Sequence, residues 1–321
     1  MDVLLVGLGS TAGLRRAEDA LAGSLERAGA SVAVARAAAQ PDVRTLAYTD
    51  LRWARAARRA ASAALRERSP QAVLYYTTTA ALLWPRRGAI RYDALAADNR
   101  PGRHGAWQRP LERRRLGQAP LVVPSVADMR HPTGVVVPPA VDPSGPPLPR
   151  SIAAITYAAN PHKKGLDRVL AAWRRARRDG EELVVAGAEG TDAEGVRYAG
   201  TLDPGSYRAL VRRARVYVSG SRWEEFGIAQ LEALADGCLL ATMPARGNAV
   251  YVPLARGLDA RLVSREIEGL AAAIRTALDD PAPDYAERAA RLLAPYSIAV
   301  VDALVADRLL PELMRTQPKG V

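Results

Sequence analysis

The feature that most constrains the fold of this chain is a repeated alternation of short apolar segments with longer amphipathic ones. In the first half, the apolar segments have the length of buried strands and lie at residues 3–6, 31–35, 73–76, 90–92, 121–123 and 135–137. A second series begins at Ile152 and continues with residues 183–186, 196–198, 216–218 and 239–242. Strands that alternate with helices form parallel sheets with helices on their faces. We therefore predict an α/β protein with two Rossmann-like domains.

The segment between the two series, residues 137–149, is too rich in proline for a helix or a strand and predicts a linker. The predicted domains are residues 1–145 and 151–295. A last helical segment, residues 298–314, contains Pro311, which predicts a kink because proline cannot donate to the helical hydrogen-bond ladder.

The composition is that of a soluble globular protein, with 49% hydrophobic and 25% charged residues. Residues 1–6 carry no basic segment ahead of the apolar run, so we interpret them as a buried strand rather than a signal peptide. No apolar run approaches the length needed to cross a bilayer, and the cytoplasm is the expected compartment. One cysteine and three scattered histidines cannot build a metal site, so no metal is expected.

The net charge of +11 suggests an anionic partner. Arginines gather at residues 52–68 and 100–115, and the first of these segments predicts a helix with one basic side. Two interpretations stay open: peripheral contact with the acidic inner face of a membrane, or a compositional preference for arginine, since only three of the 45 basic residues are lysine. Nucleic acid is not expected, because aromatic residues make up 5% and no recognition motif is present.

Residues 219–237, SGSRWEEFGIAQLEALADG, carry the clearest chemical signal. Two acids, Glu224 and Glu232, flank a turn at Gly227, and residues 228–235 predict a helix that ends at Gly237. The free N–H groups and positive dipole end of such a helix start hold phosphate, and Glu232, one turn inside, can accept hydrogen bonds from a sugar diol. Two acids at this spacing also occur by chance, but this setting is typical of a sugar-nucleotide site.

The same run resembles the E-x7-E region of retaining glycosyltransferases of the GT4 family. The positions that match in register are Ser221, Glu224, Phe226, Gly227, Glu232, Ala233, Ala235 and Gly237, whereas Glu225 replaces the usual glycine. The resemblance implies a GT-B fold, with two facing Rossmann-like domains, a cleft between them and a final helix (about 296–321) that completes the first domain. It also implies metal-independent transfer from a nucleotide-diphosphate sugar to a glycan or lipid-linked acceptor. Glu232 would hold the ribose and Glu224 the transferred sugar, with Phe226, Gly227 and Ile228 at the donor.

Residues 160–167, NPHKKGLD, match a second element of that family, in which an arginine and a lysine neutralise the donor diphosphate. Lys164 matches the lysine, and Asn160 and Lys163 are further donor-binding candidates. Ala159 stands where the family has the arginine, which removes a bidentate phosphate donor. The alternative is a helix start with solvent-facing lysines, but two of the chain's three lysines at this point favour function.

The remaining candidates are weaker. Thr201 and Leu202 resemble the segment that meets the donor base, and the glycine-rich loop with Gly9, Thr11 and Gly13 resembles a loop that borders the cleft. Asp93 is the candidate that polarises the acceptor hydroxyl, with Arg91 or Arg103 keeping it ionised, or else a structural cap of its turn. Tyr92 stands where many relatives have a histidine.

Two other functions are compatible with these residues. The missing arginine and histidine fit a sugar-nucleotide-binding protein that has lost catalysis. Residues 7–12, GLGSTA, fit the dinucleotide pattern G-x-G-x-x-A, and the following predicted strand ends near Arg36, which fits an NADP-dependent oxidoreductase. We rank the second function lowest, because no acid–base group typical of hydride transfer accompanies the pattern.

Overall fold

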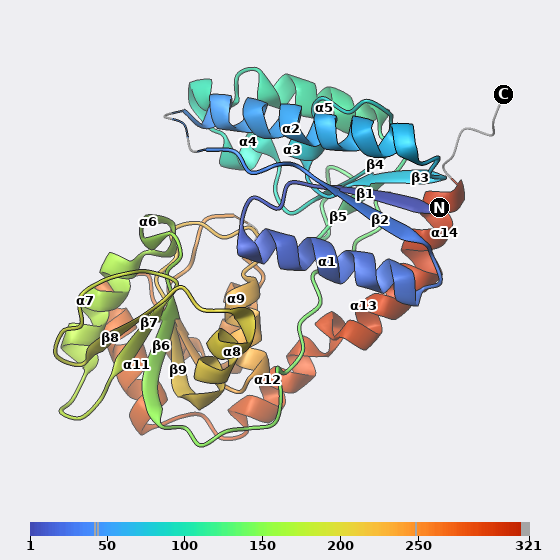
Figure 1. Ribbon diagram of the computed structural model, residues 1–321. Coiled ribbons are helices and arrows are strands. Elements are labelled where there is room, and N and C mark those ends of the chain that lie inside the picture. Colours follow the sequence, from blue (N-terminus) through green and yellow to red (C-terminus); the bar gives the residue numbers. More distant parts are fainter. Residues whose placement is uncertain (42, 44, 248, 316–321) are drawn as a thin grey trace. The chain divides into compact units, whose positions relative to one another are not determined.

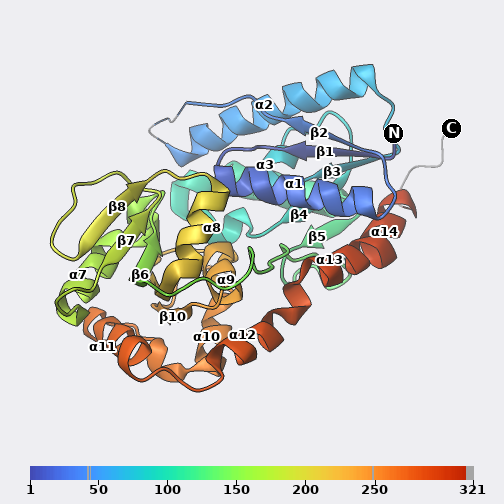
Figure 2. The same ribbon diagram turned by 60° about the horizontal axis from the view of Figure 1, so that its bottom comes forward.

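The computed structural model describes residues 1–41, 43, 45–247 and 249–315, and the chain divides into two compact units (Figures 1 and 2). Unit 1 consists of Met1–Ala140 together with Ile298–Val321, and unit 2 is Val141–Ser297. The division falls at the start of the proline-rich segment. Of the predicted C-terminal completion of the first domain, residues 316–321 lie outside the described residues.

The sheet of unit 1 has five parallel strands in the order β2-β1-β3-β4-β5. They are β1 (Val3–Gly7), β2 (Val32–Arg36), β3 (Ala72–Tyr75), β4 (Ala89–Tyr92) and β5 (Val122–Pro124). The predicted strand at residues 135–137 is wrong. The N–H groups of Val135 and Val137 do donate to carbonyls of β5, at 3.1 and 2.9 Å, but Pro138 and Pro139 follow and have no N–H with which to extend the ladder.

Both faces of this sheet are apolar and buried, as is usual for a parallel sheet. Val3 and Leu5 belong to one core cluster, whereas Leu4 and Val6 belong to the other. The helical elements of the unit are α1 (Ala12–Arg27), α2 (Leu46–Glu67), α3 (Thr78–Ala81), α4 (Ala96–Asn99), η1 (Gly102–Gly105), α5 (Gln108–Gln118), α13 (Ile298–Leu304), η4 (Val305–Leu309) and α14 (Leu310–Arg315). Residues of α1 and of the C-terminal helices fill the first cluster, and residues of α2 fill the second.

The C-terminal helix contains one π-helical turn, η4, directly before Pro311. Proline lacks an N–H and its ring presses on the carbonyl four residues earlier, so a wider turn at this point relieves both problems. Val301, Val305, Leu309 and Leu313 stay on one side and are buried in the core of unit 1. The predicted disturbance at Pro311 thus takes the form of a π-helical turn.

The stretch Tyr285–Arg315 is long and apolar enough to cross a membrane by length and composition alone. No apolar segment of this length is predicted from the sequence. The backbone of Ser297 is extended, with φ −62° and ψ 150°, so the helix is interrupted there. Beyond this residue one side of the helix packs on the core of unit 1. Burial at every fourth residue is the pattern of a helix that covers a sheet.

Unit 2 repeats the architecture, with strand order β10-β9-β6-β7-β8 and all strands parallel. The strands are β6 (Ile152–Tyr157), β7 (Leu183–Ala186), β8 (Val196–Gly200), β9 (Ala214–Ser219) and β10 (Leu239–Thr242). The helical elements are α6 (Pro161–Lys164), α7 (Leu166–Ala176), α8 (Pro204–Arg213), α9 (Ile228–Ala235), α10 (Tyr251–Leu258), η2 (Ala260–Leu262), α11 (Ile267–Asp279), α12 (Tyr285–Leu293) and η3 (Ala294–Tyr296). The predicted α/β class with two Rossmann-like units is confirmed.

The order of strands in unit 2 determines where a ligand can bind. From β6 the chain proceeds outward to β7 and β8 and then returns to place β9 on the other side of β6. The loops that follow β6 and β9 therefore leave the same edge of the sheet in opposite directions. Such a switch point is where open α/β sheets bind their ligands.

Candidate functional site

Two loops meet at the switch point of unit 2: residues 158–165 after β6 and residues 220–227 after β9. Gly165 has the left-handed φ of +63°, and a Cβ on it would lie 2.0 Å from the carbonyl oxygen of Gly220. Only glycine permits this close approach. The backbone N–H of Arg222 donates to the carbonyl of Lys163 at 2.9 Å, so the two loops are also bonded directly.

Two ion pairs cross between these loops, and a third joins the second loop to α7. The Nζ of Lys164 lies 2.5 Å from Oε1 of Glu224, and the Nζ of Lys163 lies 2.9 Å from Oε2 of Glu225. The third pair joins Arg222 to Asp167 and is bidentate, at 2.7 and 2.6 Å. Two consecutive lysines thus face two consecutive glutamates. The predicted residues Lys163, Lys164 and Glu224 lie together in the folded chain.

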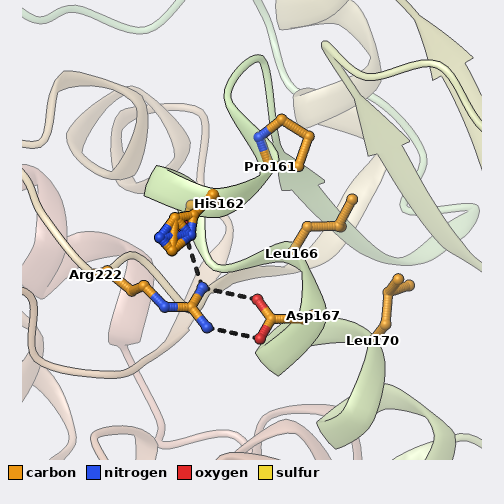
Figure 3. A pocket seen from close by; sticks show the side chains of 6 residues that line it. All are labelled: Pro161, His162, Leu166, Asp167, Leu170 and Arg222. Atoms are coloured by element: carbon orange, nitrogen blue, oxygen red, sulfur yellow. Dashed lines mark hydrogen bonds and ion pairs between the residues drawn. The ribbon is translucent and has the colours of Figure 1, made fainter. Parts of the chain in front are cut away.

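Figure 3 shows the third ion pair beside a shallow hollow on the α6–α7 side of these loops. Arg222 also donates to the carbonyl of His162 at 3.0 Å. The hydrogen bonds from Arg222 lower the pKa of Asp167 to about 2. The guanidinium of Arg222 is therefore held by this chain's own acceptors and fastens α6 and α7 to the loop after β9.

The carboxylate of Glu224 accepts several hydrogen bonds. Its Oε1 accepts hydrogen bonds from the Oγ of Ser221 at 2.9 Å and the Nε2 of Gln230 at 3.3 Å, in addition to the ammonium of Lys164. Its backbone N–H donates to the carbonyl of Arg246 at 2.9 Å, and the residue is 5% exposed. Several donors from different elements hold this carboxylate in one orientation.

Glu225, which replaces the family's glycine, is also tied down. Its carboxylate accepts from the Nζ of Lys163 and, at 3.0 Å, from the indole Nε1 of Trp223. Desolvation would raise the pKa of Glu225, but the charge of Lys163 and these hydrogen bonds lower it. The substitution thus gives the loop a second anchor to the lysine-bearing segment.

The turn before α9 requires glycine. Gly227 has φ +95°, and a Cβ there would lie 2.3 Å from the ring of Tyr251. The first N–H groups of α9 have no partner within the helix, as at any helix start. Phe226 is 3% exposed, and its ring meets that of Tyr296 edge to face at 5.9 Å, so it is a core residue that supports the turn. Ile228, the first residue of α9, is half-buried.

Glu232 lies on α9, one turn after its start, and is 8% exposed. Its Oε1 is 3.1 Å from the Nη1 of Arg208, which α8 contributes. The same arginine also binds Asp236 through Nε at 2.6 Å. Both acids of the E-x7-E pattern therefore have a cation of this chain beside them.

The other predicted donor residues are not part of these ion pairs. Asn160 caps α6, since its side-chain oxygen accepts the N–H of Lys163 at 2.9 Å. Thr201 and Leu202 follow β8, which β7 separates from β6 in the sheet. No contact of Thr201 or Leu202 with Lys164 is found among the described residues. Ala159 is exposed and provides no donor for phosphate.

In unit 1 the glycine-rich loop after β1 is filled by a side chain of the chain itself. The N–H groups of Leu8 and Gly9 donate to the carboxylate of Glu18 at 2.8 and 3.0 Å, and Glu18 is fully buried. A Cβ on Gly7 would lie 2.4 Å from that carboxylate. Arg36 pairs with the other oxygen of Glu18 at 2.8 Å.

This arrangement argues against a dinucleotide site. The N–H groups that would hold a pyrophosphate already have an anion, and the arginine that would meet a 2′-phosphate already has a partner. The other predicted loop residues have structural positions. Thr11 caps α1 by accepting the N–H of Leu14 at 3.1 Å, and Gly13 is the second residue of that helix.

Asp93 directly follows β4 and lies 2.9 Å from the Nη1 of Arg91, whose side chain is almost fully buried. The guanidinium of Arg91 in turn stacks over the ring of Tyr76 at 4.3 Å. Arg91 is thus the partner that the sequence suggested for Asp93. Tyr92 donates its hydroxyl to Asp128 at 2.9 Å, and the ring of His131 meets it edge to face.

Sequence reasoning missed three residues of these groups: Glu18, Arg208 and Gln230. Glu18 and Arg208 reach their partners from other elements, and nothing in their sequence spacing indicates this. Gln230 could have been found, because it lies in the predicted helix two residues before Glu232. Among the described residues, no group of three or more His, Cys, Asp or Glu side chains is placed to hold a metal ion.

The whole chain has the GT-B fold. Solved structures that share it include sucrose-phosphate synthase from Thermosynechococcus elongatus, with a TM-score of 0.73, 15% identity, and coverage of 99% of this chain and 100% of that one. WaaG, a glycosyltransferase involved in lipopolysaccharide biosynthesis, has a TM-score of 0.68, 16% identity, and coverage of 96% and 99%. Anabaena HepE, solved in complex with UDP and glucose, has a TM-score of 0.65, 13% identity, and coverage of 96% and 99%.

The sequence of unit 2 defines the family more closely. Residues 148–292 match the sequence model described as glycosyl transferases group 1. Over 145 residues the chain is 36% identical to a glycogen synthase of Mycobacterium tuberculosis (strain CDC 1551 / Oshkosh), an alignment that covers 40% of this chain and 34% of that protein. The aligned part thus spans about a third of the curated relatives' length. Residues 148–292 thus match the glycosyl transferases group 1 family, which confirms the resemblance predicted from residues 219–237.

Proposed function

We propose that this protein is a glycosyltransferase that takes a sugar from a nucleotide-diphosphate sugar and passes it to an acceptor hydroxyl with retention of configuration. The observation that carries the proposal is the meeting of Lys164 and Glu224 at 2.5 Å, at the switch point of unit 2. Family membership of the same residues supports the donor class. The complex of Anabaena HepE with UDP and glucose supports it as well.

The roles follow from charge and position. Lys164 and the N–H groups at the start of α9 would neutralise the donor diphosphate, Glu232 would accept the ribose hydroxyls, and Glu224 would accept hydroxyls of the transferred sugar. Retention without a protein nucleophile implies that the acceptor attacks from the face that the leaving phosphate departs from. That phosphate would take the acceptor proton, with Asp93 of unit 1 polarising the acceptor hydroxyl. No metal ion has a role in this proposal.

The test is a screen of UDP-, GDP-, ADP- and dTDP-sugars for binding and for donor hydrolysis, followed by two variants. Glu232→Ala is expected to raise the KM for the donor about tenfold, because a charge-assisted hydrogen bond to the ribose is lost. Lys164→Met is expected to lower kcat by about 100-fold, because it removes a charge that stabilises the leaving phosphate. Unchanged kinetics in both variants would refute the assignment.

The second function is a sugar-nucleotide-binding protein without catalysis. Ala159 in place of the family's arginine favours it, and Arg222 does not compensate, because Asp167 and the carbonyl of His162 hold its guanidinium. Calorimetry and the hydrolysis assay separate the two functions. Binding of a nucleotide sugar without any turnover supports this second function.

We also propose that unit 1 contacts an anionic membrane, so that the acceptor is a lipid or lipid-linked glycan. Exposed arginines on α2 and α5 have no acidic partner among the described residues, namely Arg55, Arg58, Arg59, Arg113 and Arg114. Burial and the like charges of Arg114 and of Arg58 lower the pKa of Arg115, so charges from α2 and α5 act on each other. Arg178 and Arg261 of unit 2 are exposed as well, but they face aspartates.

Flotation with vesicles tests this contact, using phosphatidylcholine alone and phosphatidylcholine mixed with phosphatidylglycerol. The full chain is expected to float only with the acidic vesicles. The triple variant Arg55→Gln, Arg58→Gln, Arg59→Gln is expected to lose this binding. The control with equal charge loss, Arg256→Gln, Arg265→Gln, Arg291→Gln on unit 2, is expected to keep it. Equal loss in both variants, or binding to RNA in place of vesicles, contradicts the proposal.

A further inference from the structure

Arg208 of α8 is a cation of unit 2 that is held by several partners at once. Its guanidinium contacts Oε1 of Glu232 at 3.1 Å and Oδ2 of Asp236 at 2.6 Å. It also donates to the carbonyl of Asp142 at 2.9 Å and, at 3.4 Å, to the carbonyl of Glu232. Its side chain is 12% exposed. An arginine that is held at so many points has one orientation.

Asp236 anchors this arginine to the rest of the unit. It is the last residue before Gly237 at the end of α9, and its carboxylate accepts the N–H and the Oγ of Ser144 at 2.7 and 3.0 Å. Asp236 is 6% exposed. The guanidinium of Arg208 therefore sits between a buried acid that is itself fixed and Glu232, the acid proposed to bind ribose.

The contact with Glu232 leaves that acid with binding capacity. A carboxylate has about four lone-pair positions, and the Nη1 of Arg208 lies at Oε1. Hydroxyl groups can therefore still donate to Glu232 while the arginine holds this oxygen in place. A carboxylate that does not have to be ordered on binding loses less entropy when a ligand arrives.

We propose that Arg208 is a positioning residue, which holds Glu232 in the orientation that accepts the ribose hydroxyls of a nucleoside diphosphate. This inference rests on the proposed function. Arg208 does not touch the ligand in this account; it acts through Glu232. Its removal would take away the cation that holds Oε1 of Glu232 and would leave Asp236 without its buried counter-ion.

Arg150 provides a matched control from the same region. It donates to the carbonyl of Asp236 at 2.7 Å and to the carbonyl of Ala214 at 2.6 Å, and it lies 3.7 Å from the sulfur of Cys238. Like Arg208 it is a half-buried arginine that fastens the end of α9, but none of its hydrogen bonds involves Glu232. A purely structural role predicts that the two arginines behave alike.

The experiment compares ribose recognition in the full chain and two variants, Arg208→Gln and Arg150→Gln. The probes are UDP and ADP and their 2′,3′-dideoxy forms, measured by calorimetry. The wild type is expected to bind the better ribose form about tenfold more tightly than its dideoxy form, as one lost charge-assisted hydrogen bond implies. Arg208→Gln is expected to reduce this ratio to about one, with the affinity for the dideoxy form unchanged, whereas Arg150→Gln is expected to keep the wild-type ratio.

Arg208→Lys covers the case in which Arg208→Gln does not fold. A single ammonium cannot span both Glu232 and Asp236, so the ratio is expected to fall at least threefold while the charge is kept. If Arg208→Gln or Arg208→Lys keeps the wild-type ratio, or if Arg150→Gln loses it equally, the inference is wrong and the proposed function stands. If the wild type binds no nucleotide of the donor screen, these four probes included, the proposed function fails together with the inference.

Discussion

At the scale of single residues, the ion pair between Lys164 and Glu224 has to break before Lys164 can hold a phosphate. The two charges are 2.5 Å apart, and Glu224 is buried among further donors from Ser221 and Gln230. The carboxylate thus occupies a place that suits a phosphate oxygen. A diphosphate that enters would exchange with it, which frees Glu224 for hydroxyls of a sugar.

This exchange predicts opposite effects of one substitution on binding and on turnover. Glu224→Gln is expected to bind UDP or ADP about tenfold more tightly, because Lys164 loses a competing anion, and to transfer sugar about 100-fold more slowly. Calorimetry and initial rates measure the two effects. Glu225→Gln is the matched control, since Glu225 pairs with Lys163 and is expected to change the affinity less. Weaker nucleotide binding by Glu224→Gln would show that no such exchange occurs.

Asp128 contributes to the dependence of the stability of unit 1 on pH. Burial would raise the pKa of Asp128, but hydrogen bonds from Arg130 and Tyr92 lower it to about 2. Because the folded pKa lies below the ordinary value of 3.8, Asp128 stabilises the fold above about pH 4, and this stability is lost as the pH falls toward 2.

Urea unfolding at several pH values between 5 and 2.5 tests this prediction. The wild type is expected to lose more free energy of unfolding over this range than Asp128→Asn, which carries no titrating group at this position. Every other carboxylate contributes equally to both proteins. Parallel curves for the two proteins would mean that Asp128 is not stabilised in the folded state.

At the scale of elements, the loops after β6 and β9 depend on backbone geometry as much as on charge. Gly165→Ala is expected to destabilise the protein by at least about 2 kcal/mol, since it combines left-handed strain with a collision against the carbonyl of Gly220. Gly13→Ala, in helix α1 with no atom within 4 Å of the new Cβ, is expected to stabilise it by about 0.5–1 kcal/mol. The free energy of unfolding in urea measures both, and equal effects of the two substitutions would contradict this explanation.

Local signals were sufficient to predict some elements and not others. The helix at residues 228–235 is found with the predicted limits, because its apolar pattern and closing Gly237 are both local. Residues 135–137 have a strand's composition, but the prolines that follow decide the outcome. The Lys164–Glu224 pair could be anticipated from two matching motifs. The Arg208–Glu232 pair could not, because it joins two helices whose packing no sequence spacing indicates.

At the scale of the whole molecule, the two units have the same architecture but differ in continuity. Unit 2 is one segment of the chain, whereas unit 1 needs the helices α13 and α14 from beyond unit 2. Leu309 of the π-helical turn is fully buried in the core of unit 1. Leu309→Ala is expected to cost unit 1 about 2–5 kcal/mol, as a cavity in a packed core does.

Thermal unfolding with and without UDP or ADP measures this effect. The variant is expected to lower the temperature at which unit 1 unfolds and to keep the wild-type nucleotide affinity, because the proposed donor residues all belong to unit 2. Leu292→Ala, a partly exposed position on α12, is the control and is expected to change little. A parallel loss of nucleotide affinity and of stability in Leu309→Ala would mean that the units do not behave independently.

The discontinuity of unit 1 also has a consequence for biosynthesis. A ribosome synthesises all of β6 to α12 before α13, so the five-stranded sheet made earlier still lacks the part of its cover over Val3 and Leu5 that the C-terminal helices provide. During that interval α1 covers this apolar face only in part, and exposed apolar surface of this kind is what chaperones bind. Synthesis of unit 1 therefore begins before that of unit 2 and ends after it.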